Sequence, residues 1–236
     1  MATVAARAAE AADPGTPADV LAALAADRAV KVRIALARNP AVSTEILRAL
    51  VDDSRWEVRF TAAENRSQDA VRVALAATHV DTREIAAQRC DLAPAEIETI
   101  LRDPARQVRQ QLADATDDPE ILSRLARDEH PYVRASAVLN DHMSTADTEM
   151  LAEDRIARVR GAAAASRRLR PATLTKLASD RSVDVRWNVL AHNPERLDLA
   201  ALIAEDDDET NSGQARSQLE DPRTFTEHLG DVDLIR

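Results

Sequence analysis

One feature constrains this chain more than any other: a Val-Arg pair recurs at a nearly constant interval along most of the sequence. Successive copies are 26, 24, 26, 25, 26 and 26 residues apart once the weaker copy Thr82-Arg83 is included. Degenerate copies at Ala6-Arg7 and Ala215-Arg216 flank the array. Tandem similarity at such a period indicates a stacked-repeat architecture. The first residues of the seven central pairs are Val32, Val58, Thr82, Val108, Val133, Val159 and Val185.

Each repeat is predicted to contain two short helices. Apolar residues recur three and four positions apart over residues 44–50, 96–101 and 120–125, which is a helical period. An aspartate five residues before the valine is expected to cap the second helix, because its carboxylate can accept free N–H groups there. That helix is predicted to bury the valine and the residue four positions later. It is expected to end near Asn39, Asn65, Asn140 or Asn193.

Composition favours the same architecture. Aromatic residues make up only 2% of the chain, there are four glycines, and 47 of the 236 residues are alanine. Helices of eight to ten residues are marginal alone in water, so stacking must stabilise them. The sequence therefore predicts an all-α fold, an α-solenoid of about eight to nine two-helix repeats with a period of about 25 residues. The four glycines are too far apart for a P-loop, a dinucleotide-binding turn or a nucleophile elbow.

The repeat resembles known families. The D-x-x-x-x-V-R pattern resembles HEAT repeats, and the shorter period with the segment N-P-x-x-[ST]-x-E-x-L, seen at 39–47, is more similar to the bacterial leucine-rich repeat variant (LRV). This resemblance implies a right-handed superhelix in which α and 3₁₀ helices alternate. Some LRV proteins carry a cysteine-ligated iron–sulfur cluster. Because Cys90 is the only cysteine here, that feature is not carried over.

The repeats are expected to form a single solenoid domain over residues 1–236. Within it, residues 1–26 are predicted to be an N-terminal capping repeat and residues 27–204 the central repeats. The acidic run at 205–213 is interpreted as a loop insert, and residues 214–236 as a degenerate C-terminal capping repeat.

The repeated charges are expected to be structural. Arginines at a constant repeat position could bind a row of phosphates, but six of them come with an aspartate in the same repeat. In HEAT-like repeats the equivalent residues pair between neighbouring repeats. We therefore expect a structural ladder formed by Asp27, Arg33, Asp53, Arg59, Asp103, Arg109, Asp128, Arg134, Asp154, Arg160, Asp180 and Arg186.

Charge is distributed unevenly. Residues 155–186 contain nine basic and two acidic residues, a net charge of +7, in a chain whose net charge is −10. Such a segment could bind an acidic protein, RNA or DNA, or it could be a chance cluster. Its most concentrated part is predicted at a turn between helices and consists of Arg167, Arg168 and Arg170.

Four of the five aromatic residues are further candidates. Phe60 and Trp187 share one repeat position whose other occupants vary, and this indicates a surface or an edge. Rigid aromatic side chains there would anchor a partner, or they would fill gaps between alanine-rich helices. Together with Trp56 and Tyr132 they complete the candidate partner-binding set.

These observations predict a cytoplasmic, non-enzymatic scaffold that binds a protein or peptide on its concave face. The alternative is a HEAT-like nucleic-acid-binding module that uses residues 155–186; HEAT-like DNA glycosylases have a comparable length. A scaffold for other enzymes differs from the first hypothesis only in its partner. The sequence predicts no catalytic residue, cofactor, metal site, small-molecule substrate or membrane association, because the histidines lack metal-ligand spacing and no apolar segment is long enough to span a bilayer.

Overall fold

The computed structural model describes residues 2–67 and 69–220. Over these residues the chain forms 17 α-helices and no β-strand, in agreement with the predicted all-α repeat fold. Two compact units are present: the first ends at Ala115 and the second begins at Thr116. The sequence predicted one domain, and nothing in the repeat pattern marks this division.

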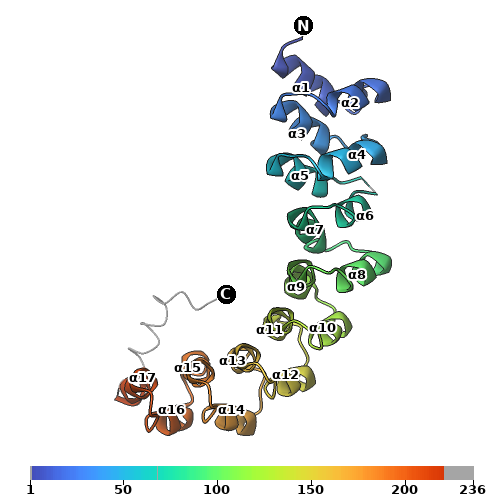
Figure 1. Cartoon of the computed structure of the whole chain (residues 1–236). Coiled ribbons are helices and arrows are strands. Elements are labelled where there is room, and N and C mark those ends of the chain that lie inside the picture. The colour runs from blue at the N-terminus through green and yellow to red at the C-terminus, as the bar shows by residue number, and fades with distance from the viewer. Residues whose placement is uncertain (1, 68, 221–236) are drawn as a thin grey trace. The chain divides into compact units, whose positions relative to one another are not determined.

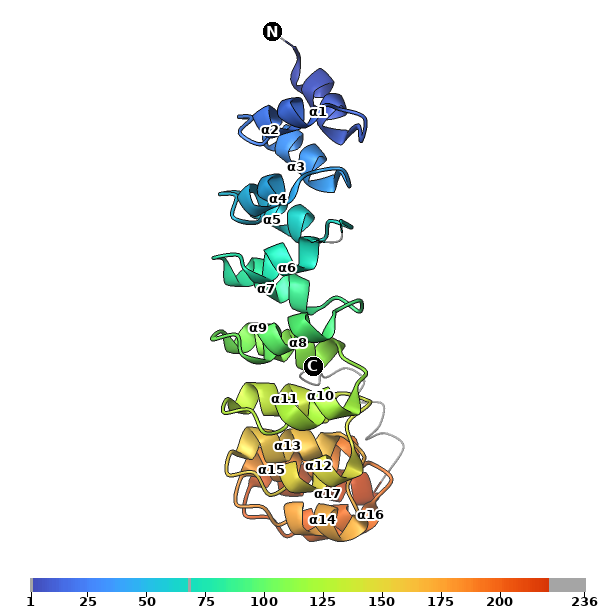
Figure 2. The same cartoon turned by 90° about the vertical axis from the view of Figure 1, so that its right-hand side faces the viewer.

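The first unit contains nine helices that stack repeat upon repeat. Helices α1, α3, α5, α7 and α9 form one layer, while α4, α6 and α8 pack on one another in a second layer. Figure 2 shows this stack in chain order. The helices are α1 (Val4–Ala12), α2 (Ala18–Leu24), α3 (Val30–Arg38), α4 (Thr44–Val51), α5 (Trp56–Ala63), α6 (Ala70–Leu75), α7 (Val80–Ala87), α8 (Pro94–Leu101) and α9 (Arg106–Ala115).

The second unit has the same two-layer arrangement. Its odd-numbered helices pack directly on one another, and in Figure 1 they lie on the inner side of the curve that this unit makes. The even-numbered helices form the outer row. The helices are α10 (Pro119–Leu125), α11 (Pro131–Leu139), α12 (Thr145–Leu151), α13 (Ala157–Ala165), α14 (Pro171–Leu177), α15 (Val183–His192), α16 (Leu197–Ile203) and α17 (Glu209–Glu220).

The repeated valine is the centre of the core. All seven residues at this position are completely buried, and so, to within 2%, are the residues four positions later. Thr82 is tolerated there because its hydroxyl donates a hydrogen bond to the Val51 carbonyl at 3.2 Å. The helices that carry these side chains pack on neighbouring helices of both layers, so each repeat depends on its neighbours for burial.

Small residues set how closely the helices approach. On α13, a side chain at Gly161 would place its Cβ atom 3.1 Å from Nδ2 of Asn188 on α15. Glycine therefore permits the close contact between these two helices, in the same way that alanines permit it elsewhere in the layer.

Two local predictions are wrong. The ladder aspartates are not N-caps: Asp27 lies two residues before the N-cap Ala29 and accepts the N–H of that residue at 2.8 Å. This local bend, of the kind Asp often makes, leaves the rest of the carboxylate available to another repeat. The alternation of α and 3₁₀ helices is also not found, since the first helix of each described repeat is α-helical.

The predicted acidic loop insert at 205–213 is wrong as well. Residues 205–208 form an ordinary turn between repeats, and α17 begins at Glu209. Asp208 caps this helix by accepting the N–H of Asn211 at 2.9 Å. Asn211, buried and 26 residues after Val185, takes the valine position, so the predicted copy at Ala215-Arg216 is out of register. The remainder of the predicted C-terminal cap, 221–236, lies outside the described residues.

Candidate partner-binding surfaces

A ladder of ion pairs runs along one end of the odd-numbered helices. In the complete form of a rung, the arginine donates Nε and Nη2 to the aspartate of the following repeat, and Nη1 to the backbone carbonyl six residues before it. This form is found at Arg33, Arg83, Arg134, Arg160 and Arg186. Arg160, for example, contacts Asp180 at 2.7 Å through both nitrogens and the Asp154 carbonyl at 2.8 Å. The pairs are Arg7–Asp27, Arg33–Asp53, Arg83–Asp103, Arg134–Asp154, Arg160–Asp180 and Arg186–Asp206.

The ladder guanidinium groups are therefore engaged within the protein. Most of these arginine and aspartate side chains are 5–14% exposed, and only Arg7 at the end of the array reaches 29%. A row of phosphates could not bind them without breaking these pairs. The predicted ladder omitted Arg7, Arg83 and Asp206, although all three occupy its spacing. Asp206 was overlooked because it lies within the acidic run at 205–213.

A second ladder, of asparagines, lies at the other end of the same helices. Asn39 donates from Nδ2 to the carbonyls of Ala11 and Asp13, at 2.9 and 3.0 Å. Asn65 repeats this pattern with Ala37 and Asn39, at 2.7 and 3.1 Å. These asparagines were predicted only to end helices. Their buried amides also satisfy the last carbonyls of the preceding repeat, which a helix leaves without partners.

An exposed aromatic pair stands on the odd-numbered layer of the first unit. Trp56 and Phe60, one turn apart on α5, are 61% and 40% exposed, and their rings meet edge to face with centroids 6.4 Å apart. Equivalent positions on α3 and α7 also carry apolar side chains. We call this set the apolar row: Val30, Ile34, Trp56, Phe60 and Val80.

The other two aromatic candidates are less available. Tyr132 on α11 is 39% exposed, but the Arg158 guanidinium lies over its ring, 4.5 Å from the centroid. Trp187 on α15 is half-buried at a repeat position that Ala135 and Gly161 occupy on the preceding helices. The structure thus brings Trp56 and Phe60 together and leaves Trp187 half-buried on a different helix.

The basic segment 155–186 is largely neutralised. Five of its nine basic residues form ion pairs, and four of the five carboxylates lie outside the segment, where a sequence window does not count them. The pairs beyond the ladder are Arg168–Asp141, Arg170–Glu149 and Lys176–Glu153. Within the described residues, no carboxylate pairs with Arg155, Arg158, Arg167 or Arg181.

Arg167 has an unusual backbone. Its φ of 57° lies in the left-handed region, where no other described non-glycine residue is found. It follows the C-cap Ser166 of α13, the position at which helices usually place glycine. Its exposed side chain lies near His192, whose pKa is lowered by burial and by the Arg167 charge.

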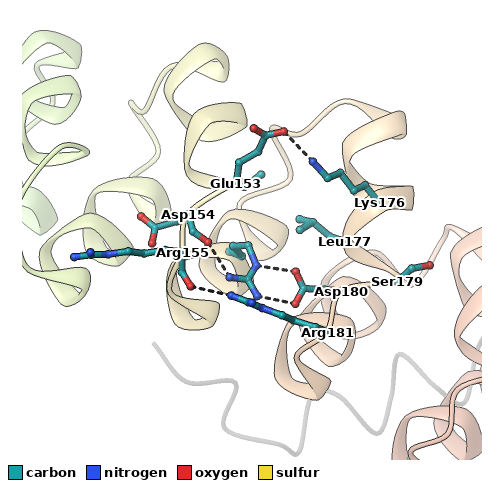
Figure 3. Close-up of a pocket in the computed structure, with 10 residues that line it drawn as sticks. Glu153, Asp154, Arg155, Lys176, Leu177, Ser179, Asp180 and Arg181 are labelled. Carbon is teal, nitrogen blue, oxygen red and sulfur yellow. Dashed lines mark hydrogen bonds and ion pairs between the residues drawn. The ribbon is translucent and has the colours of Figure 1, made fainter.

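A hollow of about 490 Å³ lies between two consecutive turns of the second unit (Figure 3). One wall is the α12–α13 turn, with Glu153, Asp154 and Arg155. The other is the end of α14 and the α14–α15 turn, with Lys176, Leu177, Ser179, Asp180 and Arg181. Lys176 pairs with Glu153 at 2.9 Å on one side of the hollow, and Arg181 contacts the Arg155 carbonyl at 3.4 Å on the other.

Comparison with known proteins identifies the repeat type. No protein-family model and no curated protein matches the chain. A solved structure described as a leucine-rich repeat variant with a novel repetitive structural motif is similar to it, with a TM-score of 0.55 and 27% sequence identity over 73% of this chain and 70% of that one. The chain is an LRV-like helical repeat protein. This agrees with the resemblance carried by the 39–47 segment.

The described residues of the LRV-like array contain neither a metal-binding cluster nor a membrane-spanning helix. Among the residues that the structure describes, no three histidine, cysteine or acidic side chains are grouped so that they could hold a metal ion. Cys90 is exposed and forms no disulfide. No helix in the described part of the chain is long and apolar enough to cross a membrane.

One rung of the LRV-like ladder is imperfect. Ala77 occupies the aspartate position of its repeat, because its carbonyl accepts Nη1 of Arg83 just as the Asp27 carbonyl accepts Nη1 of Arg33. Arg59 pairs with Asp81 instead, through Nη2 alone. Its Nε atom is buried without a hydrogen-bond partner.

Ala77→Asp should repair this rung and raise the free energy of unfolding by about 1 kcal/mol, since the new carboxylate can accept from Arg59 through two nitrogens. Urea unfolding followed by circular dichroism measures the change. In the same series, Asp81→Ala should destabilise the natural chain. The same substitution should be nearly neutral in the Ala77→Asp background. Equal effects of Asp81→Ala in both backgrounds would show that the new carboxylate does not replace Asp81.

The ladder lowers the pKa values of its aspartates. Hydrogen bonds from Arg7, with a further bond from the Ala29 N–H, bring the pKa of Asp27 to about 2. Burial by itself raises the pKa values of Asp154 and Asp180, but the hydrogen bonds from Arg134 and Arg160 outweigh it, and both pKa values are lowered from 3.8.

The stability of this protein should therefore fall as the pH is lowered into the range where the ladder aspartates become protonated. A carboxyl group with a lower pKa in the folded than in the unfolded state stabilises the fold above its unfolded-state pKa, and this stabilisation disappears as the pH falls through the folded-state value. We expect the melting temperature to be constant from neutral pH to about pH 5 and to fall steeply between about pH 4 and pH 2. Circular dichroism melts across this range provide the test. A flat profile down to pH 2 would contradict the ladder.

Proposed function

We propose that this chain is a non-enzymatic scaffold that binds a protein or peptide partner on the odd-numbered layer of its helices, anchored by the apolar row. The observation that carries this proposal is the exposed Trp56–Phe60 pair. Contiguous apolar side chains exposed on a protein surface often mark an interaction site. Rigid aromatics are also the side chains that most often dominate binding at protein interfaces.

The neighbourhood of the pair supports this assignment. Val30 and Ile34 on α3 and Val80 on α7 continue the apolar surface on both sides of α5. Beyond Val80 the row ends at Glu84, which is half-buried and whose pKa is raised by burial and by Asp81. An extended apolar strip of three helices with a carboxylate at its edge suits a segment with apolar side chains and a basic residue.

An enzymatic role has less support. The sequence lacks the glycine-dependent motifs that place phosphates or a nucleophile. The hollow of about 490 Å³ in the second unit is open, and most of the side chains that line it are charged or polar. Catalytic sites instead tend to combine a well-formed apolar pocket with a few convergent polar groups.

Nucleic-acid binding is the weaker alternative. A phosphate backbone needs many free cations in a row, whereas five of the nine basic residues of segment 155–186 are paired and the chain as a whole is acidic.

Affinity capture with the full chain tests the proposal. The immobilised natural protein, the double variant Trp56→Ala with Phe60→Ala, and a control variant are each incubated with an extract of the source organism, and retained proteins are quantified by mass spectrometry. Leu202→Ala is the matched control, since Leu202 is 48% exposed on α16 of the other layer. We expect at least one protein to be retained by both the natural and the control chains. The double variant should retain roughly tenfold less of that protein, or even less.

Identical retention by all three chains would refute the role of the apolar row. Because both aromatic side chains are substantially exposed, the double variant should keep the melting temperature of the natural chain to within a few degrees, which a circular dichroism melt verifies before capture.

A further inference from the structure

We propose that the hollow between the α12–α13 and α14–α15 turns binds a short, extended acidic peptide segment. This inference goes beyond the proposed function: it concerns the second unit, uses none of the apolar-row residues, and names the chemistry of its ligand.

The first observation is a local row of cations. The residue that follows the ladder aspartate is Arg155 in one turn and Arg181 in the next, and both side chains are exposed. Neither forms an ion pair within the described residues. In Figure 3 the Arg181 side chain lies across the gap between the two turns, and Arg155 extends away from it along the surface.

The second observation is the loosely held Lys176. It lies on the opposite side of the hollow from Arg181 (Figure 3), and its pair with Glu153 is 68% exposed on both sides. Exposed pairs of this kind are worth little, so a ligand carboxylate can replace Glu153 at low cost. The hollow thus has a cation on each side, Lys176 and Arg181, with Leu177 between them, and the Arg155 cation lies on the adjoining surface.

The spacing of these groups selects an extended ligand. A single small anion would need donors that converge on one point, as in bidentate recognition. Here Arg155, Arg181 and Lys176 point in different directions, so several carboxylates along a chain are required to engage all three.

The residues on either side of Arg155 and Arg181, at the same repeat position, favour a short ligand. At the equivalent position the preceding turn carries Glu129 and the following turn carries Asp207. Acidic residues on both sides limit the cationic surface to two repeats. A nucleic-acid backbone, with regularly spaced charges along its whole length, would meet these carboxylates, whereas a peptide with a few consecutive acidic residues would not.

Fluorescence anisotropy with the full chain tests this assignment. The probes are a labelled peptide with four consecutive glutamates flanked by glycine and serine, the same peptide with glutamines, and a labelled single-stranded oligonucleotide. We expect the glutamate peptide to bind at about 50 mM salt, more weakly at about 200 mM, and at least about fivefold more tightly than the other two probes.

Variants locate the site. The double change Arg155→Gln with Arg181→Gln should weaken glutamate-peptide binding about fivefold or more, and Glu153→Gln should strengthen it by freeing Lys176. Arg28→Gln is the matched control and should leave binding unchanged. Arg28 occupies the same repeat position in the first unit, but the equivalent residue of the next turn is Ser54, so no second cation accompanies it there. The Trp56→Ala and Phe60→Ala variant should also bind normally, which separates this inference from the proposed function.

Three results would overturn the proposal. Equal binding of the glutamate and glutamine peptides would exclude recognition of carboxylates. A double variant that binds like the natural chain, with the same melting temperature, would place the site elsewhere. Tighter binding of the oligonucleotide than of the peptide, lost in the double variant, would assign these cations to nucleic acid instead.

Discussion

Arg160→Ala is expected to lower the free energy of unfolding of the second unit by about 3 kcal/mol, because removing one partner of a buried ion pair leaves the other charge without compensation. Arg160 is 6% exposed and donates three hydrogen bonds, two to the Asp180 carboxylate and one to the Asp154 carbonyl. Without it, the Asp180 side chain keeps only the Ser182 N–H, at 2.8 Å. The carboxylate and the carbonyl would then both be buried and poorly satisfied.

Urea unfolding measured by tryptophan fluorescence can test this in the second unit alone. The chain has two tryptophans, and in a Trp56→Phe background only Trp187 reports. Lys176→Ala is the matched control, since it removes an ion pair that is exposed on both sides; its effect should stay below about 1 kcal/mol. Arg160→Lys should recover little of the loss, because lysine cannot donate two parallel hydrogen bonds to one carboxylate. Equal losses for Arg160→Ala and Lys176→Ala would show that the ladder does not hold the repeats together.

The repeat architecture could be predicted because it depends on local, recurring features. The valine position is buried in all seven central repeats, and the helices follow the apolar period of the sequence. Each repeat packs only on its neighbours, so no long-range pairing had to be inferred.

The roles of individual polar residues were harder to predict. An aspartate before a helix has the composition of an N-cap, yet Asp27 uses one oxygen for a local N–H and both for Arg7 of the preceding repeat. Which role the aspartate takes depends on how closely the preceding repeat packs against it. The sequence pattern of one repeat does not contain that distance. The asparagine ladder was missed for the same reason, because its acceptors lie 24–28 residues away.

Charge counted along the sequence was also a poor guide to surface charge. The +7 of residues 155–186 is reduced by carboxylates at Asp141, Glu149, Glu153 and Asp206, all outside the counted window. In a stacked array, a side chain meets residues about one repeat away as readily as its own neighbours. A candidate surface therefore has to be judged by position in the repeat, as the row Glu129, Arg155, Arg181 and Asp207 illustrates.

Asn65→Ala is the second large effect that we expect, a loss of about 2–3 kcal/mol in the first unit, because two buried carbonyl groups would lose their only side-chain donor. Asn65 is 3% exposed, and its Nδ2 atom bridges the Ala37 and Asn39 carbonyls at the end of α3. Its Oδ1 atom accepts the Ser67 N–H at 2.8 Å, which fixes the turn that leads to α6. One side chain thus joins two repeats and shapes the connection between them.

Asn65→Asp separates these two roles. Aspartate can still accept the Ser67 N–H, but it brings a negative charge to two carbonyl oxygens, so it should destabilise the chain at least as much as alanine does. Thr61→Ala is the matched control: it lies on α5, and its hydroxyl bonds only the Glu57 carbonyl of the same helix, at 2.7 Å, so its effect should be within about 0.5 kcal/mol. Urea unfolding gives the magnitudes, and hydrogen exchange should show lost protection in α3 and α5. If Asn65→Asp were as stable as the natural chain, the turn bond to Ser67 and not the bridge to α3 would be the contribution of Asn65.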